Sequence, residues 1–238
     1  MSRPPASARP QPLPSPLASW PPAWTPAAVV FDCDGLLVDT ESRWVVLQDA
    51  YLASHGAAFD EVTRRAVTGQ SAEVVVTTIA EHVGKEPLLV ADELFAAHRE
   101  DVTEQEPPLP GAVEIVRAAA AAVPVAVASN SPRDLLDAKL AAIGLLDVVD
   151  ATVSIDDVAH GKPAPDLYLT AAAALGAAPG DCLALEDSEV GGRAATSAGL
   201  HLLAVPSVPG QAPEAPRTLA SLEDPVLREW VAGWERRR

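Results

Sequence analysis

Two aspartates separated by one residue, Asp32 and Asp34, are the first side chains along the chain whose types and spacing suggest chemistry. They lie in the segment VVFDCDGLLVDTE, after a short apolar run, and Gly35 permits the tight turn that follows. If the extended geometry persists, both carboxylates emerge on the same side of the chain. The alternatives are a simple strand-ending turn and a calcium loop, and the calcium loop is disfavoured because Arg43 stands where its closing glutamate would be.

Polar residues also mark three later segments. Ser129 and Asn130 follow the apolar run VPVAVA. Glu186 and Asp187 end the run CLALED, and Lys162 stands before a proline in HGKPAPDLY. Taken singly, these residues could be helix caps, acids that complement a helix dipole, and a solvated lysine. Taken together, they supply the parts of phosphoryl transfer: a carboxylate nucleophile, ligands for a metal ion, and groups that hold the equatorial oxygens.

The elements that must position these residues follow from the hydrophobic pattern. Apolar runs predict five buried strands, at residues 27–32, 123–129, 151–155, 182–186 and 201–205. Segments with helical spacing lie between them, at 112–122, 132–143, 163–175 and 189–198. This alternation predicts an α/β fold with a Rossmann-like, doubly wound parallel sheet and helices on both faces. The candidate residues then meet at the carboxyl edge of the sheet, where ligands bind in such folds.

The chain is predicted to divide into three parts. Residues 27–40 and 107–238 form the Rossmann-like core. Residues 41–106 show helical patterns without a convincing strand, which predicts an inserted all-helical cap. Residues 1–26 are rich in proline and are predicted to form a disordered tail.

Composition excludes several classes of protein. With 238 residues, of which 48% are hydrophobic, the chain can bury a sizeable core. The net charge of -16 argues against a basic surface for nucleic acid or anionic lipid. No run approaches the roughly 18 apolar residues needed to span a bilayer, and the start of the chain does not resemble a signal peptide. These features predict a cytoplasmic protein, a monomer without nucleic-acid or membrane partners, in which Cys33 and Cys182 are reduced core thiols.

In order and spacing, the four polar segments resemble the four motifs of the haloacid dehalogenase superfamily, in the subgroup with a helical cap after the first motif. The resemblance covers about residues 29–205, and the first motif, GKPAPD and EDSxxG carry most of it. It implies that Asp32 is the nucleophile that forms an aspartyl-phosphate. It also implies that Asp34 is the general acid and base, which protonates the leaving oxygen and then activates water.

The resemblance further implies a Mg²⁺ cofactor. The carboxylates of Asp32 and Asp187 and the backbone carbonyl of Asp34 would bind the ion, and Glu186 would assist directly or through water. Three more residues would contact the phosphoryl group: Ser129, Asn130 and Lys162.

The implied function is a Mg²⁺-dependent phosphatase of a small phosphorylated metabolite, such as a sugar phosphate or sugar-acid phosphate. The main alternative is a β-phosphoglucomutase-like mutase, which must also hold a second phosphate. Where such a mutase has a cap histidine and a cap arginine, this chain has Trp44 and the loop GQSA at 69–72, which favours a hydrolase. Arg43, Gln70 and Ser71 are candidate substrate contacts, with solvated cap surface as the alternative.

Three other functions fit less well. A metal-free dehalogenase would need neither Asp34 nor an acidic fourth motif. A phosphonate-cleaving enzyme would need a cap lysine, and the only lysine between Glu41 and Glu106 is Lys85, in a predicted inter-helix turn. A non-catalytic binding protein of the same fold would be expected to lack one of the motif acids.

Overall fold

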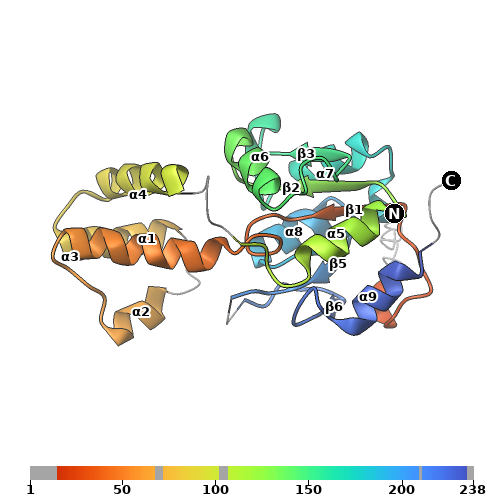
Figure 1. Ribbon diagram of the computed structural model, residues 1–238, viewed down its shortest axis with the longest axis horizontal. Coiled ribbons are helices and arrows are strands. Elements are labelled where there is room, and N and C mark those ends of the chain that lie inside the picture. Colours follow the sequence, from red (N-terminus) through yellow and green to blue (C-terminus); the bar gives the residue numbers. More distant parts are fainter. Residues whose placement is uncertain (1–14, 68–71, 102–106, 209–210, 235–238) are drawn as a thin grey trace, which may run out of the picture.

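The computed structural model describes residues 15–67, 72–101, 107–208 and 211–234 (Figure 1). One six-stranded sheet has the order β3-β2-β1-β4-β5-β6, and every neighbouring pair is parallel. The strands are β1 Ala28–Phe31, β2 Val125–Ala128, β3 Ala151–Val153, β4 Cys182–Glu186, β5 His201–Ala204 and β6 Arg217–Thr218. The doubly wound α/β fold and all five predicted strands are confirmed, and β6 is an addition.

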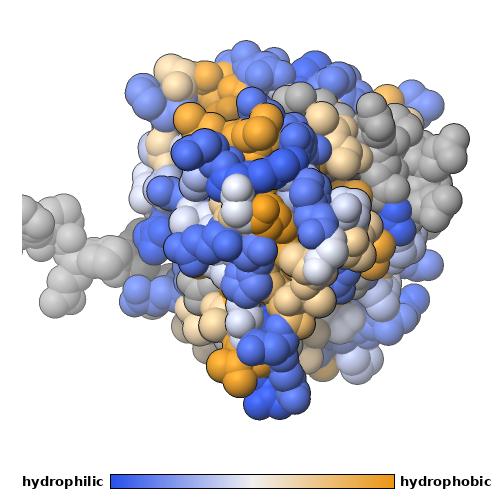
Figure 2. Space-filling view, turned by 90° about the vertical axis from the view of Figure 1, so that its left-hand side faces the viewer, coloured by the Kyte–Doolittle hydropathy of each residue, from blue (hydrophilic) through white to orange (hydrophobic). Residues whose placement is uncertain are grey.

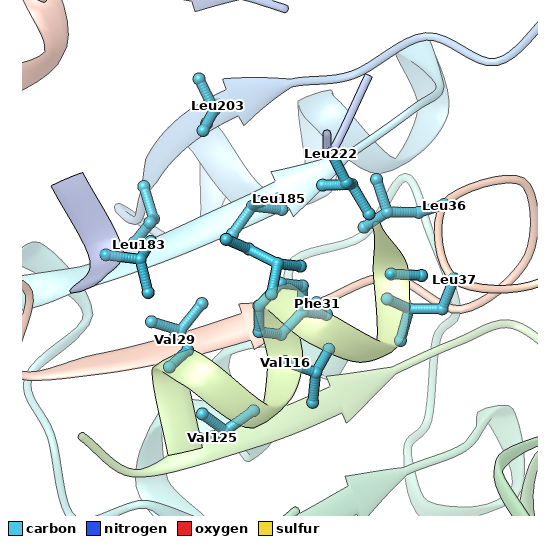
Figure 3. Packing of buried hydrophobic residues seen from close by; sticks show 14 of the residues in the cluster. Val29, Phe31, Leu36, Leu37, Val116, Val125, Leu183, Leu185, Leu203 and Leu222 are labelled. Atoms are coloured by element: carbon cyan, nitrogen blue, oxygen red, sulfur yellow. The ribbon is translucent and has the colours of Figure 1, made fainter. Parts of the chain in front are cut away.

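Helices cover both faces of this sheet (Figure 1). They are α5 Ala112–Ala120, α6 Arg133–Ala142, α7 Asp166–Ala174, α8 Glu189–Ser197 and α9 Pro225–Ala232. Successive side chains of β1 point to opposite faces of the sheet, as they do in any β-strand. Val29 and Phe31 pack in the cluster that includes Val116 of α5 (Figure 3). Ala28 and Val30 pack in the cluster that includes Tyr168 of α7. The strand that carries Asp32 at its end is therefore buried on both sides.

In its described part, the insertion after β1, which we call the cap, contains the helices α1 Thr40–Ser54, α2 Glu61–Val67, α3 Ala72–Val83 and α4 Pro87–Asp101 (Figure 1). They enclose a hydrophobic cluster of their own, which includes Leu52, Ile79 and Leu94. On the face shown in Figure 2, apolar side chains are interspersed with hydrophilic ones, as is ordinary for a surface in water.

The two connections between cap and core run side by side. The backbone N–H of Asp39 donates to the carbonyl of Pro107 over 3.1 Å, and that of Leu109 donates to Leu37 over 3.0 Å. A bridge also joins Val38 to Pro108. These paired linkers fix where the cap leaves the core, close to the end of β1.

Residues 15–26 pack against the core, so the prediction of a disordered tail over residues 1–26 is wrong for this part, and residues 1–14 lie outside the described residues. Leu17 is completely buried in the core cluster, and the ring of Trp20 meets that of Trp230 edge-on at 5.4 Å. The indole N–H of Trp230 also donates to the carbonyl of Trp24 over 3.0 Å. The composition argument failed here because a few large apolar side chains among the prolines bury enough surface to order the segment.

Candidate active site

Asp32 follows β1 at the centre of the sheet and is 5% exposed. Its backbone N–H donates to Leu185 of the neighbouring strand β4, which places it beside Glu186 and Asp187 at the end of β4. Gly35 completes the turn with a φ of +77°, and a side chain there would overlap the carboxylate of Asp187. The turn therefore brings the first and fourth motifs into contact.

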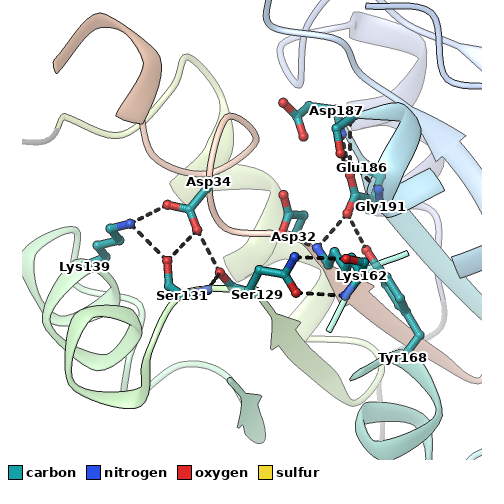
Figure 4. Close-up of polar contacts among 12 residues, drawn as sticks. Asp32, Asp34, Ser129, Ser131, Lys139, Lys162, Tyr168, Glu186, Asp187 and Gly191 are labelled. Atoms are coloured by element: carbon teal, nitrogen blue, oxygen red, sulfur yellow. Dashed lines mark hydrogen bonds and ion pairs between the residues drawn. The ribbon is translucent and has the colours of Figure 1, made fainter. Parts of the chain in front are cut away.

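Asp32 and Asp34 do not direct their carboxylates to the same partners, contrary to the simple extended-chain expectation. Asp32 pairs with Lys162, whereas Asp34 turns away toward Lys139 (Figure 4). The reason is that β1 ends at Phe31 and the chain turns immediately after Asp34. Both aspartates still line one cleft of about 240 Å³, together with Asn130, Lys162 and Asp187.

Lys162 is the positive centre of the nucleophile side of the cleft. Its ammonium group pairs with Asp32 and donates to Glu186 Oε1 over 2.6 Å, and it lies 5.2 Å from the centre of the Tyr168 ring. Burial alone would lower the pKa of this lysine, but the two carboxylates outweigh burial and raise it above its usual value. Lys162 is therefore a permanent cation beside Asp32.

Three buried carboxylates, those of Asp32, Glu186 and Asp187, offer oxygen atoms that all lie within 4.8 Å of one another. Burial and the negative charge of its neighbours raise the pKa of Asp32 to about 7 and that of Asp187 to about 9. One lysine does not neutralise this cluster. A hard divalent cation such as Mg²⁺ would relieve the repulsion, so the residues fit an oxygen-liganded metal ion.

Glu186 itself is already well supplied with partners. Its Oε1 accepts from Lys162 and from the Tyr168 hydroxyl over 2.8 Å. Its Oε2 accepts from the backbone N–H groups of Asp187 and Ser188. These bonds suit a residue that holds Lys162 and the β4–α8 loop more than one that binds an ion with a free oxygen.

Asn130 brackets the backbone of Lys162. The N–H of Lys162 donates to Asn130 Oδ1 over 2.8 Å, and Asn130 Nδ2 donates to the Lys162 carbonyl over 3.3 Å. A side chain on Gly161 would overlap the same amide. The amide predicted to bind substrate is thus engaged in fixing the lysine loop.

Lys139 and Ser131 are site residues that the sequence did not reveal. Lys139 is 2% exposed and pairs with Asp34 Oδ1, and Asp34 Oδ2 accepts from the hydroxyls of Ser129 and Ser131 over 2.7 and 2.8 Å (Figure 4). Burial alone would raise the pKa of Asp34, but these partners hold it below its usual value. The available signal was a lysine on the apolar face of a helix, next to Leu136 and Leu140.

The structure does not bring the three predicted cap contacts, Arg43, Gln70 and Ser71, into the described site. Gln70 and Ser71 lie outside the described residues. Arg43 lies in the first turn of α1 and is not among the described residues that line the cleft. Its neighbour Trp44 stacks on Phe95 of α4, with ring centres 5.8 Å apart. A role for the three in binding substrate stays a prediction.

The chain also resembles known proteins. A family model described as haloacid dehalogenase-like hydrolase matches residues 26–199. A bifunctional riboflavin kinase/FMN phosphatase of Arabidopsis thaliana is 33% identical over 216 residues, 86% of this chain and 55% of that protein, so the chain spans about half of that relative. The fructose-1-phosphate phosphatase YqaB of Escherichia coli (strain K12) is 32% identical over 181 residues, 75% of this chain and 96% of that protein.

A solved structure shows the same architecture. The putative beta-phosphoglucomutase from Thermotoga maritima superposes with a TM-score of 0.71 over 85% of this chain and 97% of that one, at 24% identity, a likeness that concerns the fold alone. No helix among the described residues is long and apolar enough to cross a membrane. The chain belongs to the haloacid dehalogenase superfamily, in the subgroup with a helical cap, and is a phosphoric monoester hydrolase.

Proposed function

We propose that this enzyme is a Mg²⁺-dependent phosphatase that hydrolyses a small phosphorylated metabolite, a sugar phosphate or sugar-acid phosphate, through an aspartyl-phosphate on Asp32. The observation that carries the proposal is the placement of Asp32: it is buried at the end of the central strand, paired with Lys162, within the three-carboxylate cluster, and on the wall of the cleft. The similarity to a bacterial fructose-1-phosphate phosphatase supports the substrate class.

The residues of this chain divide the reaction between them. In the first step a carboxylate oxygen of Asp32 attacks phosphorus. Asp34, which must first take up a proton because its partners favour the ionised form, gives that proton to the leaving oxygen as the bond between this oxygen and phosphorus breaks. In the second step Asp34 takes a proton from water, and the water oxygen attacks the phosphorus of the aspartyl-phosphate. The bond between phosphorus and the Asp32 oxygen breaks, which releases phosphate and restores the Asp32 carboxylate. Lys162 and the Ser129 hydroxyl hold the phosphoryl oxygens throughout. Asp34 must leave its contact with Ser129 to act, because that hydroxyl also serves the phosphoryl group.

The carboxylates of Asp32 and Asp187 and the backbone carbonyl of Asp34 would hold Mg²⁺. When bound, the ion neutralises charge on the phosphoryl oxygens and on the clustered acids. Glu186, whose oxygens already accept five hydrogen bonds, acts indirectly by fixing Lys162 and the backbone after β4. We further propose that the enzyme acts as a cytoplasmic monomer without nucleic-acid or membrane partners.

A panel of phosphorylated metabolites, assayed with Mg²⁺ and with EDTA, tests the proposal. Free phosphate should appear in equal amount to the dephosphorylated product, and EDTA should stop its release. Full activity in EDTA would contradict the metal dependence, and no activity on any substrate, p-nitrophenyl phosphate included, would favour a non-catalytic binding protein.

The mutase alternative needs its own measurement, with β-glucose 1-phosphate, Mg²⁺ and catalytic glucose 1,6-bisphosphate. Phosphate and glucose 6-phosphate are followed together. The hydrolase proposal expects phosphate, whereas rapid formation of glucose 6-phosphate without phosphate release would make the enzyme a mutase.

A further inference from the structure

The carboxylate of Asp34 is held by side chains that lie outside the metal cluster. Both oxygens accept: Oδ1 from Lys139, and Oδ2 from the hydroxyls of Ser129 and Ser131. Lys139 belongs to α6, and the two serines belong to the loop between β2 and α6. Figure 4 shows this group on one side of the site and the acids of β4 on the other.

The group is built as a unit. Lys139 Nζ also lies 3.2 Å from Ser131 Oγ, and the backbone N–H of Ser131 donates to Ser129 Oγ over 2.9 Å. A lysine that is 2% exposed is costly to bury unless its charge is paired. Lys139 forms an ion pair with Asp34. This buried cation therefore helps to fix the Asp34 carboxylate.

Without the Lys139 cation, the Asp34 carboxylate could instead bind a metal ion held by the clustered acids. It is one residue removed from Asp32, and its backbone carbonyl is already a candidate ligand. The cluster whose oxygens lie within 4.8 Å contains Asp32, Glu186 and Asp187 but not Asp34. A divalent cation there attracts any carboxylate within reach, and a carboxylate bound to the ion cannot carry a proton.

We propose that Lys139 and Ser131 are positioning residues that keep the Asp34 carboxylate off the metal ion and so reserve it for proton transfer. This inference rests on the proposed function, because it assumes a Mg²⁺ ion among the clustered acids and a proton-transfer role for Asp34.

Calorimetric titration with Mg²⁺ tests the proposal without turnover. In Lys139→Met, the released Asp34 carboxylate should join the ion, so the Kd for Mg²⁺ should fall by about tenfold. Hydrolysis of an alkyl phosphate, whose leaving group needs a proton, should slow at the same time by about 100-fold. Ser131→Ala removes one hydrogen bond and no charge, and should shift both quantities in the same directions by less.

Two comparisons separate positioning from loss of charge or of structure. In an Asp34→Asn background, Lys139→Met should leave the Kd for Mg²⁺ unchanged, because no carboxylate remains to be released. Lys85→Met, which removes an ion-paired lysine of the cap, is the matched control and should also leave it unchanged.

Weaker or unchanged Mg²⁺ binding in Lys139→Met, or the same gain in the Asp34→Asn background, would overturn the positioning role. If Lys139→Met fails to fold, the Kd for Mg²⁺ and the rate of alkyl phosphate hydrolysis in Ser131→Ala decide instead. An unchanged Kd for Mg²⁺ in Ser131→Ala would then overturn the positioning role. A wild-type protein that neither binds Mg²⁺ nor releases phosphate would instead overturn the proposed function.

Discussion

Glu186 lies so close to Gly191 that a methyl group on residue 191 would overlap the Glu186 carboxylate. Gly191 is in the first turn of α8, where its own N–H donates to the Ser188 cap. The backbone of α8 therefore lies directly against the Glu186 carboxylate. The φ of Gly191 is not positive, so backbone conformation does not explain why this residue is a glycine. Its role is to leave room for Glu186, which in turn holds Lys162.

Gly191→Ala should displace Glu186 and with it Lys162. We expect a loss of about 2 kcal/mol in the free energy of unfolding and about 100-fold in kcat/KM. Gly180→Ala is the matched control, because a Cβ on Gly180 meets no described atom within 4 Å. Urea unfolding and phosphate release measure the two effects. Wild-type kinetics in Gly191→Ala would show that Glu186 does not position the lysine.

Asn130→Ala should slow turnover by releasing the lysine loop. Both amide atoms bond the backbone of Lys162, so their loss should lower kcat by about tenfold. A Cβ in Gly161→Ala would overlap the Asn130 amide and the Ile155 side chain, so this variant should reproduce the defect, although residue 161 carries no group that could bind substrate. A normal kcat in Gly161→Ala, with a raised KM in Asn130→Ala alone, would instead make the amide a direct substrate contact.

The core could be predicted from the sequence because its strands are buried on both faces. All five residues of β4 are buried, and a strand buried on both faces consists almost wholly of apolar residues. The sequence therefore shows a continuous apolar run at this strand. The strand β6 has two residues, Arg217 and Thr218, neither of them buried, and leaves no such pattern. The acids and Lys162 were predicted together because parallel strands present their carboxyl ends at one edge.

The partners of Asp34 could not be predicted in the same way. Lys139 lies 105 residues from Asp34 along the chain, and only the docking of α6 against the sheet brings the two together. The local sequence pattern shows that a lysine interrupts the apolar face of a helix, but it does not show which acidic side chain pairs with this lysine. The same limit applies to Trp20 and Trp24, whose partner Trp230 lies near the other end of the chain.

Mg²⁺ should stabilise the protein more at pH 9 than at pH 6. Folding raises the pKa of Asp32 from 3.8 to about 7 and that of Asp187 from 3.8 to about 9. A raised carboxyl pKa means that the folded chain holds the proton more tightly, so this contribution to stability is complete below the unfolded pKa and is lost as pH rises through the folded pKa. The metal-free protein should therefore lose stability from about pH 4 to pH 9.

Thermal unfolding at several pH values, with EDTA or with Mg²⁺, measures this. The rise in Tm on adding Mg²⁺ should grow by about 3 °C or more between pH 6 and pH 9, because protons compete with the ion at the lower pH. Asp187→Asn removes one of the two titrating groups and should flatten the difference. A Tm increment that is independent of pH would show that the clustered carboxyls do not hold the ion.

Asp32→Asn should abolish turnover and yet stabilise the metal-free protein. The amide cannot form the acyl-phosphate, so phosphate release should fall by about three orders of magnitude or more. The substitution also removes one of three clustered negative charges, while an amide oxygen can still accept from Lys162. Because the pKa of Asp32 is raised to about 7, its ionised form is disfavoured in the fold, and at pH 8 in EDTA the variant should have a Tm about 3 °C higher than the wild type. Glu81→Gln, an exposed acid of α3 outside the cluster, is the control for a general change of net charge. An inactive variant with a lower Tm would point to a damaged site, and retention of a tenth of wild-type turnover, or about that, would remove Asp32 as the nucleophile.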